Sequence, residues 1–95
     1  MRMFLRVKME VEAANRAIKD GSLAEVIQGF VDSAKPEGIW FTAQDGQRCM
    51  VAVFDLAEPA AIPRIAEPFF MAVGASLDIS PAMDYAELQA GLSGV

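Results

Sequence analysis

The order in which strand-like and helix-like apolar patterns follow each other constrains the fold of this chain more than any other feature. From Met3 to Val11 every second residue is apolar, and most of the residues between them are charged, which is typical of a strand with one buried face. Asp45-Gly46 lies between two apolar runs, 38–43 and 47–56, and predicts a two-residue hairpin. A fourth strand is expected at 76–80, where apolar and polar residues alternate again.

Helical patterns fill the intervals between these strands. The segment 12–19 is rich in alanine and charged residues and ends at Asp20-Gly21, where glycine suits a left-handed C-cap. Ser22 and Glu25 have the spacing of a capping box, followed by a helical apolar stripe that includes Phe30. Further helices are expected at 58–73, with a bend at Pro68, and at 84–92, with a capped start.

The order β, α, β, β, α, β with a final helix predicts the α+β class. A chain of 95 residues is too short for two domains, so residues 1–95 form a single domain. Two right-handed βαβ units joined through the hairpin give a ferredoxin-like βαββαβ sandwich. Its four-stranded antiparallel sheet would carry both main helices on one face, with an extra C-terminal helix.

The opposite face of this sheet would be left bare. The opposite parity in each strand assigns to it Arg2, Phe4, Arg6 and Lys8; Trp40 and Thr42; Arg48, Met50 and Phe54 or their neighbours; and Asp78 and Ser80. Such a face is too apolar for open water and too charged for a plain core. Since 54% of the residues are hydrophobic, we expect the face to meet the sheet of a second copy in a homodimer or to enclose a cavity.

Composition excludes several classes of function. A net charge of −5 argues against nucleic acid and anionic membrane surfaces as partners. The N-terminus has no signal-peptide core and no run could span a membrane, so the cytoplasm is the expected location, and the single Cys49 fits a reducing compartment. The absence of histidine removes Ser-His triads and the commonest metal ligand, and no nucleotide or calcium motif is present. No metal and no cofactor are therefore expected.

Several segments together resemble a known family. They are Asp20-Gly21-Ser22-Leu23, Lys35-Pro36-Glu37, Trp40-Phe41-Thr42-Ala43, Val53-Phe54-Asp55-Leu56 and the stretch from Ile62 to Phe70. They resemble a family of small uncharacterised bacterial proteins, which is similar to the wider dimeric α+β barrel group. That group includes cofactor-independent oxygenases, isomerases and ligand sensors. The resemblance implies the fold and the dimer rather than a particular chemistry, and the histidine that several of the group use has no counterpart here.

Arg6 and Lys8 are the most suggestive candidates for a site. Two cations two residues apart on a central strand could hold an anionic ligand, and Phe4 and Trp40 could stack on its ring. The alternative is that the cations pair with Asp78 or with carboxylates of a partner subunit, and that the aromatic residues simply fill an interface.

Three other side chains, Glu67, Cys49 and Asp45, have a chemical and a purely structural interpretation. Glu67 lies in an apolar stretch before Phe69-Phe70, where desolvation would make it a candidate general base; the alternative is a solvated pair with Arg64. Cys49 is interpreted as a small hydrophobic residue in a strand rather than a reactive thiol, and Asp45 as a turn residue.

Three functions remain open from the sequence. The first is a homodimeric domain that binds a small anionic or aromatic ligand, such as an organic acid, without catalysis. The second is a cofactor-independent enzyme of the oxygenase or isomerase type, in which Arg6 or Lys8 stabilises an oxyanion and Asp78 or Glu67 moves a proton. The third, RNA binding on the sheet, is disfavoured by the acidic charge.

Overall fold

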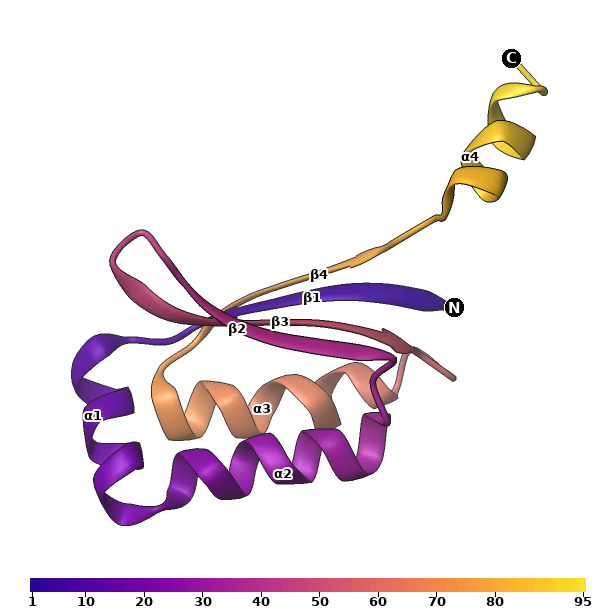
Figure 1. Ribbon diagram of the computed structural model, residues 1–95. Coiled ribbons are helices and arrows are strands. Elements are labelled where there is room, and N and C mark those ends of the chain that lie inside the picture. The colour runs from indigo at the N-terminus through magenta and orange to yellow at the C-terminus, as the bar shows by residue number, and fades with distance from the viewer.

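The computed structural model describes residues 1–95 and shows one antiparallel sheet with four helices, an α+β arrangement (Figure 1). The elements are β1 (Arg2–Lys8), α1 (Val11–Asp20), α2 (Ser22–Ala34), β2 (Gly38–Gln44), β3 (Gln47–Asp55), α3 (Ala61–Val73), β4 (Ser76–Pro81) and α4 (Tyr85–Leu92). The α+β class expected from the sequence is confirmed.

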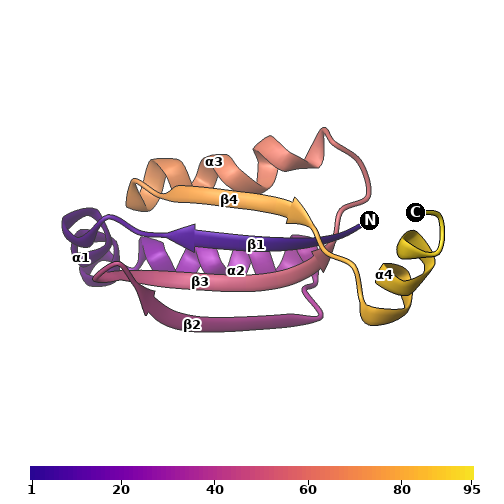
Figure 2. The same cartoon turned by 90° about the horizontal axis from the view of Figure 1, so that it is seen from above.

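The strands lie in the order β2-β3-β1-β4, and each neighbouring pair is antiparallel (Figure 2). Helices α1, α2 and α3 lie on one side of the sheet. Helix α4 stands apart from them, beyond the end of β4 and on the other side of the sheet. This leaves one sheet face without any covering helix, as the alternation of residues predicted.

Two helix ends are capped by nearby polar groups. The Glu10 carboxylate accepts hydrogen bonds from the backbone N–H groups of Ala13 (2.6 Å) and Glu12 (3.1 Å), and these bonds hold the pKa of Glu10 below its usual value. Asp84 caps α4 in the same way, because its Oδ1 accepts from the N–H of Glu87 (2.8 Å) while the Glu87 side chain accepts from the N–H of Asp84 (3.0 Å).

The predicted capping box of Ser22 and Glu25 is wrong. Helices α1 and α2 follow each other so closely that Gly21, with a φ of 84°, ends the first and begins the second. Ser22 is consequently already inside α2, and its N–H donates to Asp20 Oδ1 at 2.8 Å. The tight junction, which only glycine adopts without strain, takes over the role that the serine was expected to fill.

The β2–β3 hairpin forms as the sequence predicts. Asp45 and Gly46 have φ angles of 54° and 74°, the positive values that a two-residue hairpin turn of this kind requires at both central positions. Helix α3 begins later than expected, at Ala61 rather than Glu58, and contains Pro68 in its interior.

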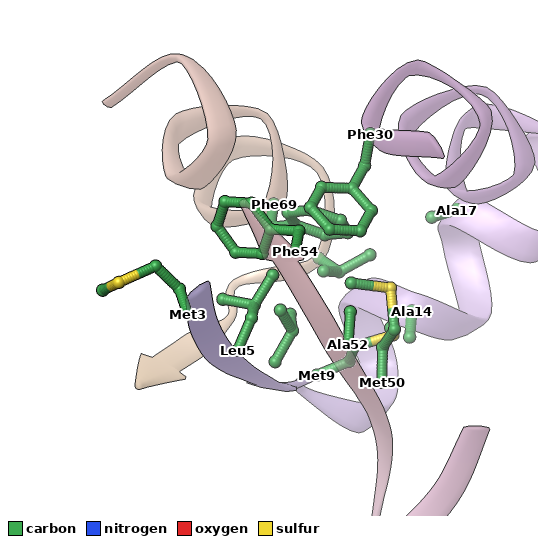
Figure 3. Close-up of a cluster of buried hydrophobic side chains, with 12 residues drawn as sticks. Met3, Leu5, Met9, Ala14, Ala17, Phe30, Met50, Ala52, Phe54 and Phe69 are labelled. Atoms are coloured by element: carbon green, nitrogen blue, oxygen red, sulfur yellow. The ribbon is translucent and has the colours of Figure 1, made fainter. Parts of the chain in front are cut away.

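The core lies between the sheet and the three helices (Figure 3). Phe30 of α2 packs edge-on against Phe54 (ring centroids 5.8 Å apart) and Phe69 (6.0 Å). Met50 and Phe54 are fully buried here, and Arg48 donates hydrogen bonds to Val11 and Asn15 of α1 on the same side. Of the two alternatives expected for β3, the bare face therefore carries the neighbours of these three residues. Residues 49–54 are apolar throughout, and only the pairing of β3 with β1 determines which of them face the helices.

Candidate functional site

The candidate site is the uncovered sheet face, which we call the open face. The register places residues that lie side by side on neighbouring strands on the same face. The open face consists of Gly38, Trp40 and Thr42 on β2; Cys49, Val51, Val53 and Asp55 on β3; Arg2, Phe4, Arg6 and Lys8 on β1; and Ser76, Asp78 and Ser80 on β4. Figure 2 views the sheet from this side.

Arg6 lies near the middle of the open face. Its neighbours across the sheet are Val51 on β3 and Asp78 on β4. The guanidinium carbon lies 5.3 Å from the centroid of the Phe4 ring, within the range of a cation–π contact. The Nε atom is enclosed by protein atoms and has no hydrogen-bond partner. Arg6 therefore brings an unpaired donor and a positive charge to an apolar part of the sheet.

Lys8 behaves differently from Arg6. Its Nζ atom lies 3.1 Å from Oδ2 of Asp45, the first residue of the hairpin turn. Asp45 is thus a turn residue, as predicted, and also the partner of Lys8. Neither cation pairs with Asp78 in the single copy, so the expected pairing with Asp78 is not formed. Of the two predicted cations, Lys8 is therefore paired with Asp45, whereas Arg6 has no partner.

Two aromatic side chains share the open face with Arg6. Phe4 is half-buried two residues away on β1, whereas Trp40 lies on the edge strand β2, next to Val51, and is 58% exposed. The indole folds back over Gly38, because a Cβ placed on that glycine would lie 2.9 Å from Cζ3 of Trp40 and closer still to Cη2. Gly38 therefore provides the space that the six-membered ring of the indole occupies.

The other predicted site residues lie elsewhere or carry no special chemistry. Glu67 is exposed on α3, in the helix layer, so the sheet separates it from Arg6 and it is not part of this site. Arg64 pairs with Glu58 (2.9 Å) instead of Glu67. Cys49 is buried, with Gln44 Oε1 3.9 Å from its sulfur, and behaves as the small hydrophobic residue that was expected.

Sequence reasoning missed a cluster of charges around Arg2. Its guanidinium lies 2.5 Å from Glu87, 3.4 Å from Glu37 and 3.9 Å from Asp84. The hydrogen bond to Glu87 raises the pKa of Arg2, and the N–H of Asp84, followed by Arg2, holds the pKa of Glu87 below its usual value. The sequence showed the capping signal at Asp84, but no local pattern indicated that Arg2 of β1 would form ion pairs with Asp84 and Glu87.

The single copy has no enclosed pocket at the open face. Its three surface hollows are lined by residues of α2, α3, β2, β3 and the adjoining loops. They include Thr42, Cys49 and Asp55 at the margins of the open face, but not Arg6, Phe4, Trp40 or Asp78. No cluster of three acidic or cysteine side chains is arranged to hold a metal ion. None of the helices has the length and apolar character needed to cross a bilayer.

No protein-family model and no curated protein matches the chain. Its function is therefore inferred from the chemistry of the open face.

Proposed function

We propose that the chain is a ferredoxin-like domain of the dimeric α+β barrel type, which binds a small organic acid between two copies without catalysis. The strand order β2-β3-β1-β4 and the three helices on one face support the fold assignment. The resemblance of several segments to a small bacterial family of this group points the same way.

The open face supports the dimer. It carries Phe4, Val51 and Val53 on the central strands and Trp40 on the edge strand β2, and no element of the same copy covers their apolar surface. Packing this face against its counterpart in a second copy would remove that surface from water, with the two sheets about 10 Å apart. A homodimer at micromolar concentration is the expected state, and sedimentation analysis measures it. A monomer mass at high micromolar concentration would contradict the dimer.

The Arg6 guanidinium, which forms no ion pair and whose enclosed Nε has no hydrogen-bond partner, is the observation that carries the ligand proposal. Once a second sheet covers the face, the guanidinium loses water, and a buried charge without a partner costs several kcal/mol. An anion between the sheets offsets this cost for both copies. A carboxylate suits the planar guanidinium, which can donate two parallel hydrogen bonds to it.

The surroundings of Arg6 indicate the rest of the ligand. The Phe4 ring lies beside the guanidinium, and the Trp40 indole lies over Gly38 on the edge strand β2, with β3 between it and Arg6. Flat aromatic surfaces favour stacking on another ring. A small aromatic carboxylate is therefore the ligand class that fits best.

A second candidate function rests on the position of Asp78, which lies directly opposite Arg6 on the neighbouring strand β4. In a cofactor-independent oxygenase or isomerase, Arg6 would stabilise a developing oxyanion and Asp78 would move the proton. Glu67 is too far removed to share this role. If the protein is such an enzyme, Asp78→Asn abolishes turnover of a bound acid while its binding persists.

A thermal-shift screen with benzoate, hydroxybenzoates and aliphatic acids of similar size tests the binding proposal. At 100 times its dissociation constant a ligand stabilises the fold by about 2.7 kcal/mol, which raises the melting temperature of a domain of this size by about 10 °C or more. Arg6→Met should lose this shift, because methionine keeps the apolar stem but not the charge.

Arg16→Met is the matched control, since Arg16 is exposed on α1 in the helix layer. It should keep the full ligand-induced shift. If no acid stabilises the wild type more than the Arg6→Met variant, the ligand site does not exist, and Arg6 is paired with a carboxylate of the second copy instead.

A further inference from the structure

Helix α4 is the one element that packs against nothing in its own copy. None of its residues is buried, and the core cluster contains no residue of this helix or of the segment that leads to it. Its ties to the body are the charged contacts of Arg2 with Asp84 and Glu87, together with the hydrogen bond from the Ala82 N–H to the Arg2 carbonyl (3.0 Å). Helix α4 therefore projects from the sheet and is attached to it only near its N-terminus.

One side of α4 is apolar and faces no partner. Tyr85, Leu88 and Leu92 recur at helical spacing and are 73%, 40% and 60% exposed. An eight-residue helix is too short to be stable in water on its own, since isolated helices below about 12 residues are marginal. Its capping box stabilises the first turn only. Burial of the apolar side against another surface is the remaining source of stability.

The position of α4 indicates what that surface is. Figure 1 shows it on the side of the sheet that α1, α2 and α3 do not cover, and Figure 2 shows it beyond the end of β4 rather than over the strands. It therefore stands beside the space above the open face. A second sheet packed on that face would occupy this space, and α4 would lie along its margin.

The combined area of the open face and α4 is compatible with a second copy as the partner. Four strands of about seven residues give a sheet with a projected area of about 440 Å², and α4, about 12 Å long and about 10 Å wide, adds about 120 Å² on the same side. The accessible surface of the side chains exceeds this projected area, and a stable interface buries about 800 Å² of accessible surface on each partner.

We propose that α4 is a dimerisation arm, whose apolar side, formed by Tyr85, Leu88 and Leu92, packs against the second copy when the open face is covered. The proposal rests on the dimer proposed above and assigns part of its interface. The Arg2 cluster holds only the N-terminal base of the arm beside the sheet, so the rest of the helix gains its stability when the second copy covers its apolar side.

Leu88→Asp and Ala90→Asp provide a matched test in the full chain. Both changes introduce one carboxylate into α4, but Ala90 lies on the side of the helix opposite Tyr85, Leu88 and Leu92. Sedimentation should show a dimer dissociation constant at least about 10-fold higher for Leu88→Asp, because a carboxylate would be buried in the interface. Ala90→Asp should remain close to the wild type.

Amide hydrogen exchange of the wild type gives a second, independent measurement. The amides of α4 should be protected at concentrations where the chain is dimeric and exchange rapidly after dilution to the monomer, whereas the amides of β1 should stay protected in both. Exchange of α4 at one rate in monomer and dimer would overturn the proposal.

The possible outcomes distinguish a failure of the arm proposal from a failure of the proposed function. A monomeric wild type contradicts both the dimer and the arm. A dimer in which Leu88→Asp and Ala90→Asp dissociate alike overturns the arm alone, and the organic-acid screen on Arg6 is then unaffected. Protection of α4 only after another macromolecule is added would also overturn the proposal, since the arm would then serve a different partner.

Discussion

Arg6 on β1 lies directly opposite Asp78 on β4, yet the two side chains form no ion pair. Asp78 is exposed, and Arg6 is half-buried with its guanidinium beside the Phe4 ring. The positive charge at the centre of the open face is therefore not neutralised within one copy. The unneutralised charge is the reason that we propose an external anion as the partner of Arg6.

The variant Asp78→Asn tests whether the side chains of Asp78 and Arg6 interact. Because Asp78 is exposed and unpaired, the free energy of unfolding should change by less than about 0.5 kcal/mol. Removing a negative charge next to Arg6 should also strengthen the binding of an organic acid a few-fold, measured by calorimetry. A loss of dimer stability of about 3 kcal/mol or more would instead mean that Asp78 pairs with Arg6 of the second copy.

Phe30→Ala should destabilise the fold by about 3–5 kcal/mol. Phe30 is buried and contacts both Phe54 and Phe69 edge-on, so its removal empties the centre of the core. Urea unfolding followed by circular dichroism measures the change. Glu12→Ala, an exposed position in the first turn of α1, is the control and should stay within about 0.5 kcal/mol of the wild type. Equal effects of the two changes would contradict the core assignment.

Gly38→Ala should displace the Trp40 indole from the sheet. The new Cβ would lie 2.9 Å from Cζ3 of Trp40, and the exposed indole can turn toward water to relieve this contact. Trp40 is the only tryptophan, so its fluorescence emission reports the movement directly as a shift to longer wavelength.

Gly29→Ala is the corresponding control, since a Cβ on Gly29 would contact nothing within 4 Å. It should leave the emission unchanged and stabilise α2 by about 0.5–1 kcal/mol, because alanine favours helices over glycine. An unchanged emission spectrum in Gly38→Ala would show that the indole does not lie over Gly38.

Acid should loosen α4 before it unfolds the body. The pKa of Glu87 is held below its ordinary value of 4.5 by the Asp84 N–H and by Arg2. The stabilising contribution of Glu87 is therefore complete above pH 4.5 and is lost as the pH falls through its lower folded-state pKa. Nuclear magnetic resonance of the α4 amides between pH 6 and pH 2 measures this transition.

Glu87→Gln is the control for this transition. It retains the shape of the side chain but cannot titrate, so the acid-dependent change in α4 should be reduced or absent. A midpoint at or above pH 4.5 for the wild-type α4 signals would contradict the role assigned to the Asp84 N–H and Arg2.

The sequence by itself determined the elements of this fold and much of their orientation. The alternation around Leu5 and Val7 predicted correctly which side of β1 faces the helices, and Asp45-Gly46 predicted the hairpin turn. The stripe that contains Phe30 identified the buried side of α2. These features are local. A short segment is enough to show the spacing of its apolar residues, and two residues are enough to specify a hairpin turn.

The tertiary structure decided what local periodicity could not. The run from Cys49 to Phe54 is apolar on both sides, so only its pairing with β1 buried Met50 and left Val51 on the open face.

The charged side chains show the same dependence on long-range contacts. Lys8 pairs with Asp45 and Arg2 with Glu87, contacts between residues 37 and 85 positions apart, and Glu67 lies outside the site because α3 occupies the helix layer. Such contacts depend on how the elements meet, because a long side chain reaches whichever partner the assembled sheet and helices bring near it.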